Sequence, residues 1–104
     1  MFESIDVEKA AELAARPGMF VLDARTMEEF SDGHLKNAVL IPHTDVQAKA
    51  DQLPKDKEMP LLVYCRSGKR SAMACNILSG LGYKKLYNLD GGILAWQDAG
   101  KPVV

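Results

Sequence analysis

Short apolar runs alternate with helix-forming segments along the chain, and this alternation constrains the fold more than any other feature of the sequence. Four runs have the composition of buried strands, at residues 19–24, 37–42, 60–65 and, together with the turn that follows, 84–92. Parallel strands need crossover connections, and the helices between the runs supply them. The pattern therefore predicts an α/β fold, with helices on both faces of a mainly parallel sheet.

Capping residues and glycines mark the ends of the expected helices. Asp6 is placed to cap the first helix, and Thr26 with Glu29 has the spacing of a capping box at the second. Gly33 ends that second helix. The expected helices span residues 7–15, 26–32, 43–53, 70–81 and 93–100.

The length and charge of the chain limit its function. Its 104 residues make one expected domain, residues 1–104, and 47% hydrophobic with 26% charged residues is typical of a folded chain. The formal net charge of −1 argues against a nucleic-acid or membrane-surface partner. No apolar run is long enough to span a membrane, and the N-terminal pattern is an acidic amphipathic helix rather than a secretion signal. A cytoplasmic location is the resulting expectation.

The segment VYCRSGKRSA concentrates positive charge directly after a cysteine. Three cations, Arg66, Lys69 and Arg70, lie within five positions around Gly68, although the whole chain is nearly neutral. Cys65 itself ends the most strand-like run in the sequence. Since ligands of open α/β sheets bind beyond the carboxyl ends of the strands, this cysteine is expected at the functional edge.

The residue types in this loop favour a reactive thiolate. Thiolates are stabilised at helix N-termini and beside cations, and a helix is expected to begin just after Cys65. Gly68 permits a turn in which successive backbone N–H groups converge into an anion-binding nest. The alternative is a small buried cysteine followed by a solvated basic turn. The coincidence of strand end, glycine, three cations and helix start favours nucleophilic chemistry at Cys65.

The second cysteine and the histidines predict neither a disulfide nor a metal site. Cys75 lies inside an expected helix, a poor position for bridging to Cys65, and is assigned to the core. With His34 and His43, the cysteines lack the spacing of a zinc site. The inward stripe of the helix is expected to comprise Ala72, Cys75, Ile77 or Leu78, and Leu81.

Four segments, taken in order, carry a family resemblance. They are VLDARTMEEFSDGHLKNAVLIP, VYCRSGKRSAMA, LGYKKLYNLDGG and GGILAW. Together they resemble a single-domain rhodanese, a member of a sulfurtransferase family, over nearly the whole chain. The resemblance implies a three-layer rhodanese-like domain with a central, mainly parallel five-stranded sheet. It also implies thiosulfate sulfurtransferase-type activity without a metal or organic cofactor.

The resemblance implies a double displacement through Cys65. Its thiolate takes the outer sulfur of a small anionic donor such as thiosulfate and becomes a persulfide. A cyanide or thiol acceptor, which includes a protein thiol, then removes that sulfur. Residues 66–70 are implied to bind the substrate: their backbone holds the transferred sulfur, and Arg66, Lys69 and Arg70 attract the donor anion. Ser67 departs from two-domain thiosulfate enzymes, which have lysine at this position.

Other residues within the matched segments are expected to be structural. Asp23 and Arg25 end a neighbouring strand within reach of the pocket, but a buried ion pair or loop anchor is the favoured interpretation. Glu29 is expected to act as a cap, and His34 as a loop histidine with satisfied hydrogen bonds. Trp96 is expected to pack in the core.

Other functions stay open at this point. Cysteine phosphatases and arsenate reductases carry a C-x5-R motif, in which an arginine lies six positions after the cysteine. In this chain the sixth position after Cys65 is Ser71, and the arginine is one position earlier, at Arg70. A histidine commonly precedes the phosphatase cysteine, whereas Tyr64 precedes Cys65 here. A non-catalytic binding module of the family would lack the cysteine. A persulfide carrier that serves one protein partner has the same residues as a free-standing enzyme.

Overall fold

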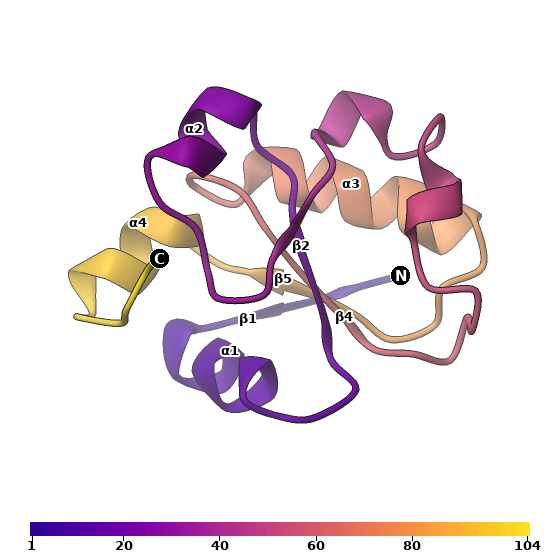
Figure 1. The fold of residues 1–104 in the computed structure, drawn as a ribbon. Helices are drawn as coiled ribbons and strands as arrows, with labels where there is room; N and C mark the ends of the chain where they lie inside the picture. The colour runs from indigo at the N-terminus through magenta and orange to yellow at the C-terminus, as the bar shows by residue number, and fades with distance from the viewer.

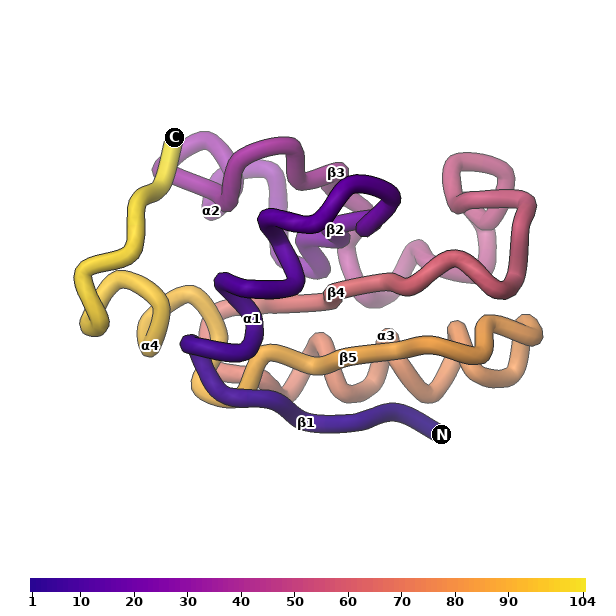
Figure 2. The backbone as a smooth tube through the Cα atoms, turned by 90° about the horizontal axis from the view of Figure 1, so that it is seen from below, coloured from indigo at the N-terminus to yellow at the C-terminus, as the bar shows by residue number.

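All five strands of the structure, a computed structural model that describes residues 1–104, lie parallel in one sheet. They are β1 (Glu3–Ile5), β2 (Phe20–Asp23), β3 (Val39–Leu40), β4 (Leu61–Tyr64) and β5 (Leu86–Leu89). Their order across the sheet is β1-β5-β4-β2-β3 (Figure 2), so β4 is the central strand. The predicted α/β class with a five-stranded parallel sheet is confirmed, and the last residue of β4 immediately precedes Cys65.

Helices cover both faces of the sheet (Figures 1 and 2). One face packs against α1 (Val7–Ala14) and α4 (Gly92–Asp98), and the other against α3 (Lys69–Gly80) and two 3₁₀ turns, η1 (His43–Asp45) and η2 (Ala50–Gln52). The short α2 (Met27–Ser31) buries none of its residues. It follows β2 and stands over the carboxyl edge of the sheet.

The central strand divides the core into two layers. Leu61 and Val63 point to the cluster under α3, while Leu62 and Tyr64 point to the cluster under α1 and α4. Each of these four side chains is 0% exposed. A strand buried on both faces has no polar alternation, which explains why this segment is the clearest apolar run in the sequence.

Local capping interactions confirm the predicted starts of the first two helices. Asp6 accepts a hydrogen bond from the Lys9 N–H at 2.9 Å. Thr26 and Glu29 form the capping box, in which each side chain accepts from the backbone N–H of the other residue. Each cap satisfies amides that have no partner within the helix.

The prediction of a continuous helix over residues 43–53 is wrong. The structure has only η1 and η2 there, joined by turns. Val46 and Leu53 are the only buried side chains of the segment, and Ala50 between them is partly buried. A short helix is stabilised mainly by burying an apolar stripe, and two large side chains seven positions apart offer too little of one.

Two further details differ from the sequence prediction. The edge strand β1 lies before the first expected run, and its three residues are too few to show a strand period. The buried stripe of α3 consists of Ser71, Ala74, Cys75 and Leu78, so Ala72 and Leu81 are only partly buried. The stripe is rotated because the first turn of α3 directs Ser71 into the sheet edge beside Cys65.

A buried polar network joins β2, β4 and the loop after α2. Arg25 donates to both carboxylate oxygens of Asp23, at 2.7 Å for the closest pair, and to the carbonyl of Gly33 at 2.7 Å. The Tyr64 hydroxyl donates to Asp23 at 2.6 Å and accepts from the Leu35 N–H at 3.0 Å. The favoured interpretation of Asp23 and Arg25 as a buried ion pair is confirmed, and their side chains are 0% and 6% exposed.

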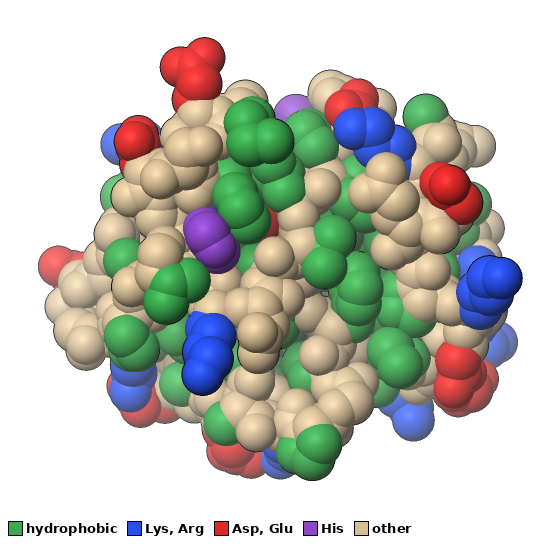
Figure 3. All heavy atoms as spheres, in the orientation of Figure 1, with side chains coloured by type: hydrophobic (Ala, Val, Ile, Leu, Met, Phe, Trp, Pro, Cys, Tyr) green, Lys and Arg blue, Asp and Glu red, His purple; other side chains and the backbone are tan.

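Charges on the surface are mixed in sign. On the face seen in Figure 3, basic and acidic side chains are interspersed, mostly around the rim, and no continuous basic patch is present. None of the helices has the length and apolar composition needed to cross a membrane.

Replacing Tyr64 with phenylalanine is expected to lower the free energy of unfolding by about 1–3 kcal/mol, measured by urea denaturation. The substitution leaves the Leu35 N–H and one oxygen of Asp23 buried without this partner. Tyr87→Phe is the matched control, because the half-buried Tyr87 hydroxyl makes no hydrogen bond, and its effect is expected to stay below about 0.5 kcal/mol. Equal effects of the two substitutions would contradict a role for the network.

Candidate active site

The Cys65 sulfur lies at the bottom of a loop that ends in the first turn of α3. Gly68 is the N-cap of α3 and has φ +107°, a left-handed conformation that favours glycine. This turn brings the Gly68 N–H to 3.0 Å from Cys65 Sγ. The Cys65 residue is 1% exposed. The predicted convergence of loop amides on the sulfur is present in the structure.

Hydrogen-bond donors in the loop favour the thiolate form of Cys65. Burial by itself raises the pKa of the thiol, but hydrogen bonds from the Ser71 hydroxyl and from the backbone N–H groups of residues 71, 68 and 67 outweigh it. The net effect lowers the pKa of Cys65 below its ordinary value. A thiolate is the nucleophilic form of cysteine, so the loop has the electrostatics of an activated thiol.

Backbone N–H groups of α4, which lies outside the loop, bind two carbonyl groups of the loop. The Ile93 N–H donates to the carbonyl of Cys65 at 2.9 Å, and the Leu94 N–H donates to the carbonyl of Arg66 at 3.2 Å. These donors are among the amides of the first turn of α4, which lack partners within the helix. Gly92 permits this approach, since a Cβ there would lie 2.3 Å from the carbonyl oxygen of Arg66. The loop amides are therefore left free to face the sulfur.

Asn88 and Ser71 hold the far side of the loop. The Asn88 side chain donates to the Gly68 carbonyl at 3.2 Å, and its oxygen lies next to the Ser71 hydroxyl. The Ser71 hydroxyl also lies 3.4 Å from Cys65 Sγ. Both residues are buried, with Ser71 0% and Asn88 5% exposed. Strand β5 thus positions the loop through one side chain, that of Asn88.

The three loop cations have different surroundings. Arg66 and Lys69 are exposed and form no ion pair. Arg70 instead donates through both terminal nitrogens to Glu29, at 2.8 Å each. Hydrogen bonding by this guanidinium lowers the pKa of Glu29 to about 2. The structure therefore leaves Arg66 and Lys69 free to meet an anion, whereas Arg70 joins the loop to α2.

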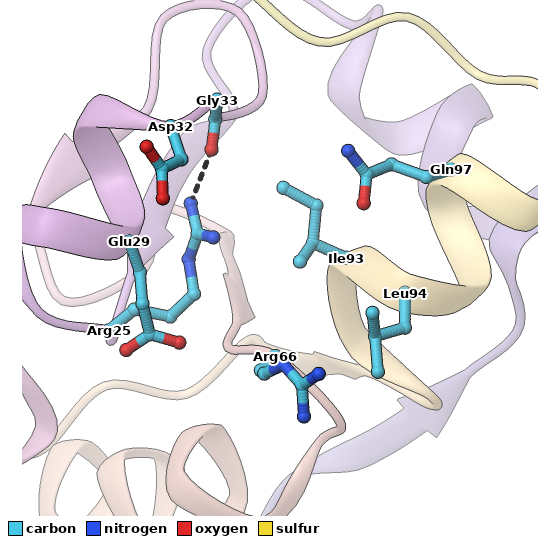
Figure 4. A pocket seen from close by; sticks show the side chains of 8 residues that line it. All are labelled: Arg25, Glu29, Asp32, Gly33, Arg66, Ile93, Leu94 and Gln97. Atoms are coloured by element: carbon cyan, nitrogen blue, oxygen red, sulfur yellow. Dashed lines mark hydrogen bonds between the residues drawn. The ribbon is translucent and has the colours of Figure 1, made fainter.

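A pocket of about 170 Å³ opens beside the loop, between α2 and α4 (Figure 4). Arg66 forms its floor, α4 contributes apolar side chains on one wall, and Arg25 lies on the opposite wall. Arg25 thus lines the pocket as well as forming the ion pair with Asp23, which does not line it. The lining residues are Arg25, Glu29, Asp32, Gly33, Arg66, Ile93, Leu94 and Gln97.

Cys75, His34 and Trp96 have contacts that fit a role in packing and hydrogen bonding within the fold. Cys75 is 0% exposed in the core under α3, and burial raises its pKa to about 12. The His34 ring stacks on Phe30 and its Nδ1 lies 3.0 Å from the Phe30 carbonyl. Trp96 is 6% exposed and donates to the Pro102 carbonyl at 2.8 Å. No three His, Cys, Asp or Glu side chains are grouped in a way that could hold a metal ion.

Sequence reasoning missed the residues that hold the loop from other elements. In the sequence, Ser71 is notable only for its distance of six positions from Cys65, and Asn88 only as a residue of an expected strand. Gly91 and Gly92 gave a detectable signal, because two successive glycines before a helix indicate a close backbone approach. Nothing in a single sequence shows which segment is approached.

Comparisons with known proteins identify the family of this chain. The profile of the rhodanese-like domain matches residues 6–99. A sulfurtransferase of Allochromatium vinosum is 36% identical over 105 residues, which cover 100% of this chain and 96% of that protein. The thiosulfate sulfurtransferase GlpE of Pseudomonas putida is 35% identical over 97 residues, covering 92% of this chain and 86% of that protein. The crystal structure of a rhodanese-related protein from Thermoplasma volcanium matches with a TM-score of 0.86 at 33% identity, covering 99% of this chain and 98% of that chain. The chain belongs to the rhodanese-like domain family.

Proposed function

We propose that this protein is a sulfurtransferase that carries sulfane sulfur as a persulfide on Cys65, from thiosulfate or a similar donor to cyanide or a thiol. The observation that carries the proposal is the Cys65 sulfur, held at 3.0 Å from the Gly68 N–H inside a loop whose carbonyls are bound from outside. Such a ring of N–H groups stabilises negative charge on sulfur without any metal. Relatives named sulfurtransferase and thiosulfate sulfurtransferase support the same reaction class.

In the first half-reaction the Cys65 thiolate attacks the outer sulfur of thiosulfate. A new S–S bond forms to Cys65, the S–S bond within thiosulfate breaks, and sulfite leaves with the bonding electron pair. The persulfide keeps one negative charge, so charge balances. The exposed cations Arg66 and Lys69 attract the dianionic donor toward the loop.

In the second half-reaction an acceptor nucleophile attacks the outer sulfur of the persulfide. The S–S bond to Cys65 breaks and its electron pair returns to Cys65 as thiolate. The loop amides bind the sulfur anion at both stages, which lowers the barrier of each step.

Phosphate chemistry fits the loop less well. A phosphatase loop needs an arginine directed at the bound oxyanion, whereas the Arg70 guanidinium is turned to Glu29 and Arg66 lies on the exposed side. The carrier role for a protein partner, by contrast, uses the same two half-reactions and differs only in the acceptor.

Cys65→Ser is expected to abolish persulfide formation, since a hydroxyl is a poor nucleophile toward sulfur and differs little in size. Intact-mass measurement after incubation with thiosulfate is expected to show one added sulfur on the native protein, lost on addition of cyanide, and none on the variant. Cys75→Ser is the matched control and should keep the added sulfur, because Cys75 is buried away from the loop in the core. A folded Cys75 variant that gains no sulfur would refute the one-cysteine mechanism.

Ser71→Ala is expected to move the midpoint of Cys65 alkylation to higher pH. The substitution removes a hydroxyl donor that favours the thiolate, so the pKa of the thiol rises toward the value set by burial. The measurement is the rate of reaction with iodoacetamide as a function of pH. Ser67→Ala serves as the control because the exposed Ser67 side chain makes no hydrogen bond to the sulfur. An unchanged midpoint in Ser71→Ala would show that the backbone amides alone lower the pKa of the Cys65 thiol.

Lys69→Ala is expected to raise KM for thiosulfate about three- to tenfold while kcat stays within about twofold, because an exposed cation aids capture more than chemistry. Raising the ionic strength should reproduce the effect in the native protein through screening. Steady-state kinetics of thiosulfate and cyanide measures both. Lys55→Ala, which removes an exposed cation before β4, is the control. A KM independent of both Lys69 and salt would contradict electrostatic capture.

A further inference from the structure

A second pocket, of about 260 Å³, lies between α1, α4, the loop that precedes β3 and residues 101–104. Figures 1 and 2 show α4 and the end of the chain beside α1. The lining residues are Ala11, Ala14, Ala15, Leu35, Lys36, Asn37, Trp96, Lys101 and Pro102. None of them belongs to the Cys65 loop or lines the pocket between α2 and α4, so this is a separate site.

Small side chains on α1 leave this space open. Ala11 and Ala14 lie three positions apart on the helix, and Ala15 is its C-cap. A helix that covers a core usually presents large apolar side chains, as α1 does elsewhere with Leu13, and such residues at the alanine positions would fill the pocket. The most buried lining residues, Leu35 and Trp96, are 2% and 6% exposed and form an apolar floor.

Hydrogen bonds fix the walls of the pocket to one another. The Trp96 indole N–H donates to the Pro102 carbonyl at 2.8 Å, and the Lys101 N–H donates to the Trp96 carbonyl at 3.1 Å. The backbones of His34 and Val104 exchange two further hydrogen bonds, of 3.1 and 2.9 Å, which tie residues 101–104 to the loop before β3. The pocket is therefore formed by folding itself, and a ligand does not have to order it at an entropic cost.

The polar edge of the pocket is basic. Lys36 and Lys101 line it, and no acidic residue does. Lys101 is paired with Glu8 at 3.1 Å, whereas Lys36 forms no ion pair. The exposed Asn37 amide follows Lys36 and adds an uncharged hydrogen-bond donor. An apolar floor with one free cation at its edge is complementary to an apolar molecule that carries one negative charge.

The size of the pocket limits what enters it. An apolar cavity of about 150 Å³ holds a benzene molecule, and pockets for drug-sized ligands begin at roughly 300 Å³. The volume of about 260 Å³ lies between these limits. A single ring or a short alkyl chain with a small head group is accommodated, whereas a cofactor of nucleotide size is not.

We infer that this pocket binds a small amphipathic carboxylate, with its apolar body against Trp96 and the alanines of α1 and its carboxylate at Lys36. Contact with the apolar walls contributes most of the affinity, and Lys36 decides the preferred charge of the head group. Since Cys65 does not line the pocket, the inference is independent of the proposed sulfur transfer.

The test uses three probes that share one apolar body and differ in the head group: 4-phenylbutyrate, 4-phenylbutan-1-ol and 4-phenylbutylamine. Trp96 is the only tryptophan of the chain, so its fluorescence and its indole N–H resonance both report on this pocket. Titration of the native protein is expected to give a Kd for the carboxylate about two- to fivefold below that for the alcohol, with the amine binding most weakly.

Two substitutions separate the charge from the apolar space. Lys36→Gln is expected to bring the Kd values of carboxylate and alcohol close to equality while binding of the alcohol stays as in the native protein. Ala14→Leu places a larger side chain in the pocket and is expected to weaken binding of all three probes about tenfold or more. Lys55→Gln and Ala48→Leu make the same changes at exposed positions outside the pocket and should leave every Kd unchanged.

Three results would overturn the inference. Absence of a saturable response to 4-phenylbutyrate in both the fluorescence and the indole resonance would exclude the site. Equal affinity of the native protein for the carboxylate and the amine would exclude the preference for an anion. Undiminished binding by a folded Ala14→Leu protein, checked by circular dichroism, would place the probe elsewhere, and the Lys36→Gln titrations decide the inference if the Ala14 variant does not fold.

Discussion

The hydrogen bonds from the first turn of α4 to the carbonyls of Cys65 and Arg66 decide what the active-site loop can bind. A peptide plane carries its C=O and N–H on opposite sides, so binding the Arg66 carbonyl from outside turns the next amide inward. The amide of Ser67 is among those that lower the pKa of Cys65. The close approach needs Gly92, because any Cβ there would overlap the Arg66 carbonyl. A helix remote in sequence thus converts an ordinary turn into a ring of donors.

The balance of charge around the loop follows from the same tertiary arrangement. Glu29 is both half of the capping box of α2 and the partner of Arg70, 41 positions away. One carboxylate therefore caps the start of a helix and pairs with a loop cation. The buried carboxylate of Asp23 pairs in the same way with Arg25, on the same wall of the pocket as Glu29. Arg66 and Lys69 are then the two loop cations that form no ion pair.

Much of the fold was predictable from local signals in the sequence. The strand runs, the Asp6 cap and the Thr26–Glu29 capping box each depend on neighbouring residues, and the structure confirms them. Residues 43–53 were mispredicted because helix propensity gave no information on how little of the segment is buried. The edge strand β1 was missed for a related reason, since pairing with β5 rather than its own pattern makes it a strand.

The sequence by itself determined the position of Cys65 at a strand end, the turn at Gly68 and the concentration of cations after it. These are properties of adjacent residues, and their backbone preferences are local. Only the tertiary structure decided that Asn88 and α4 hold the loop carbonyls, and that Arg70 is bound by Glu29 while Arg66 and Lys69 stay free. These interactions join elements far apart in the chain. Their partners are set by strand order and helix packing, which no local pattern specifies.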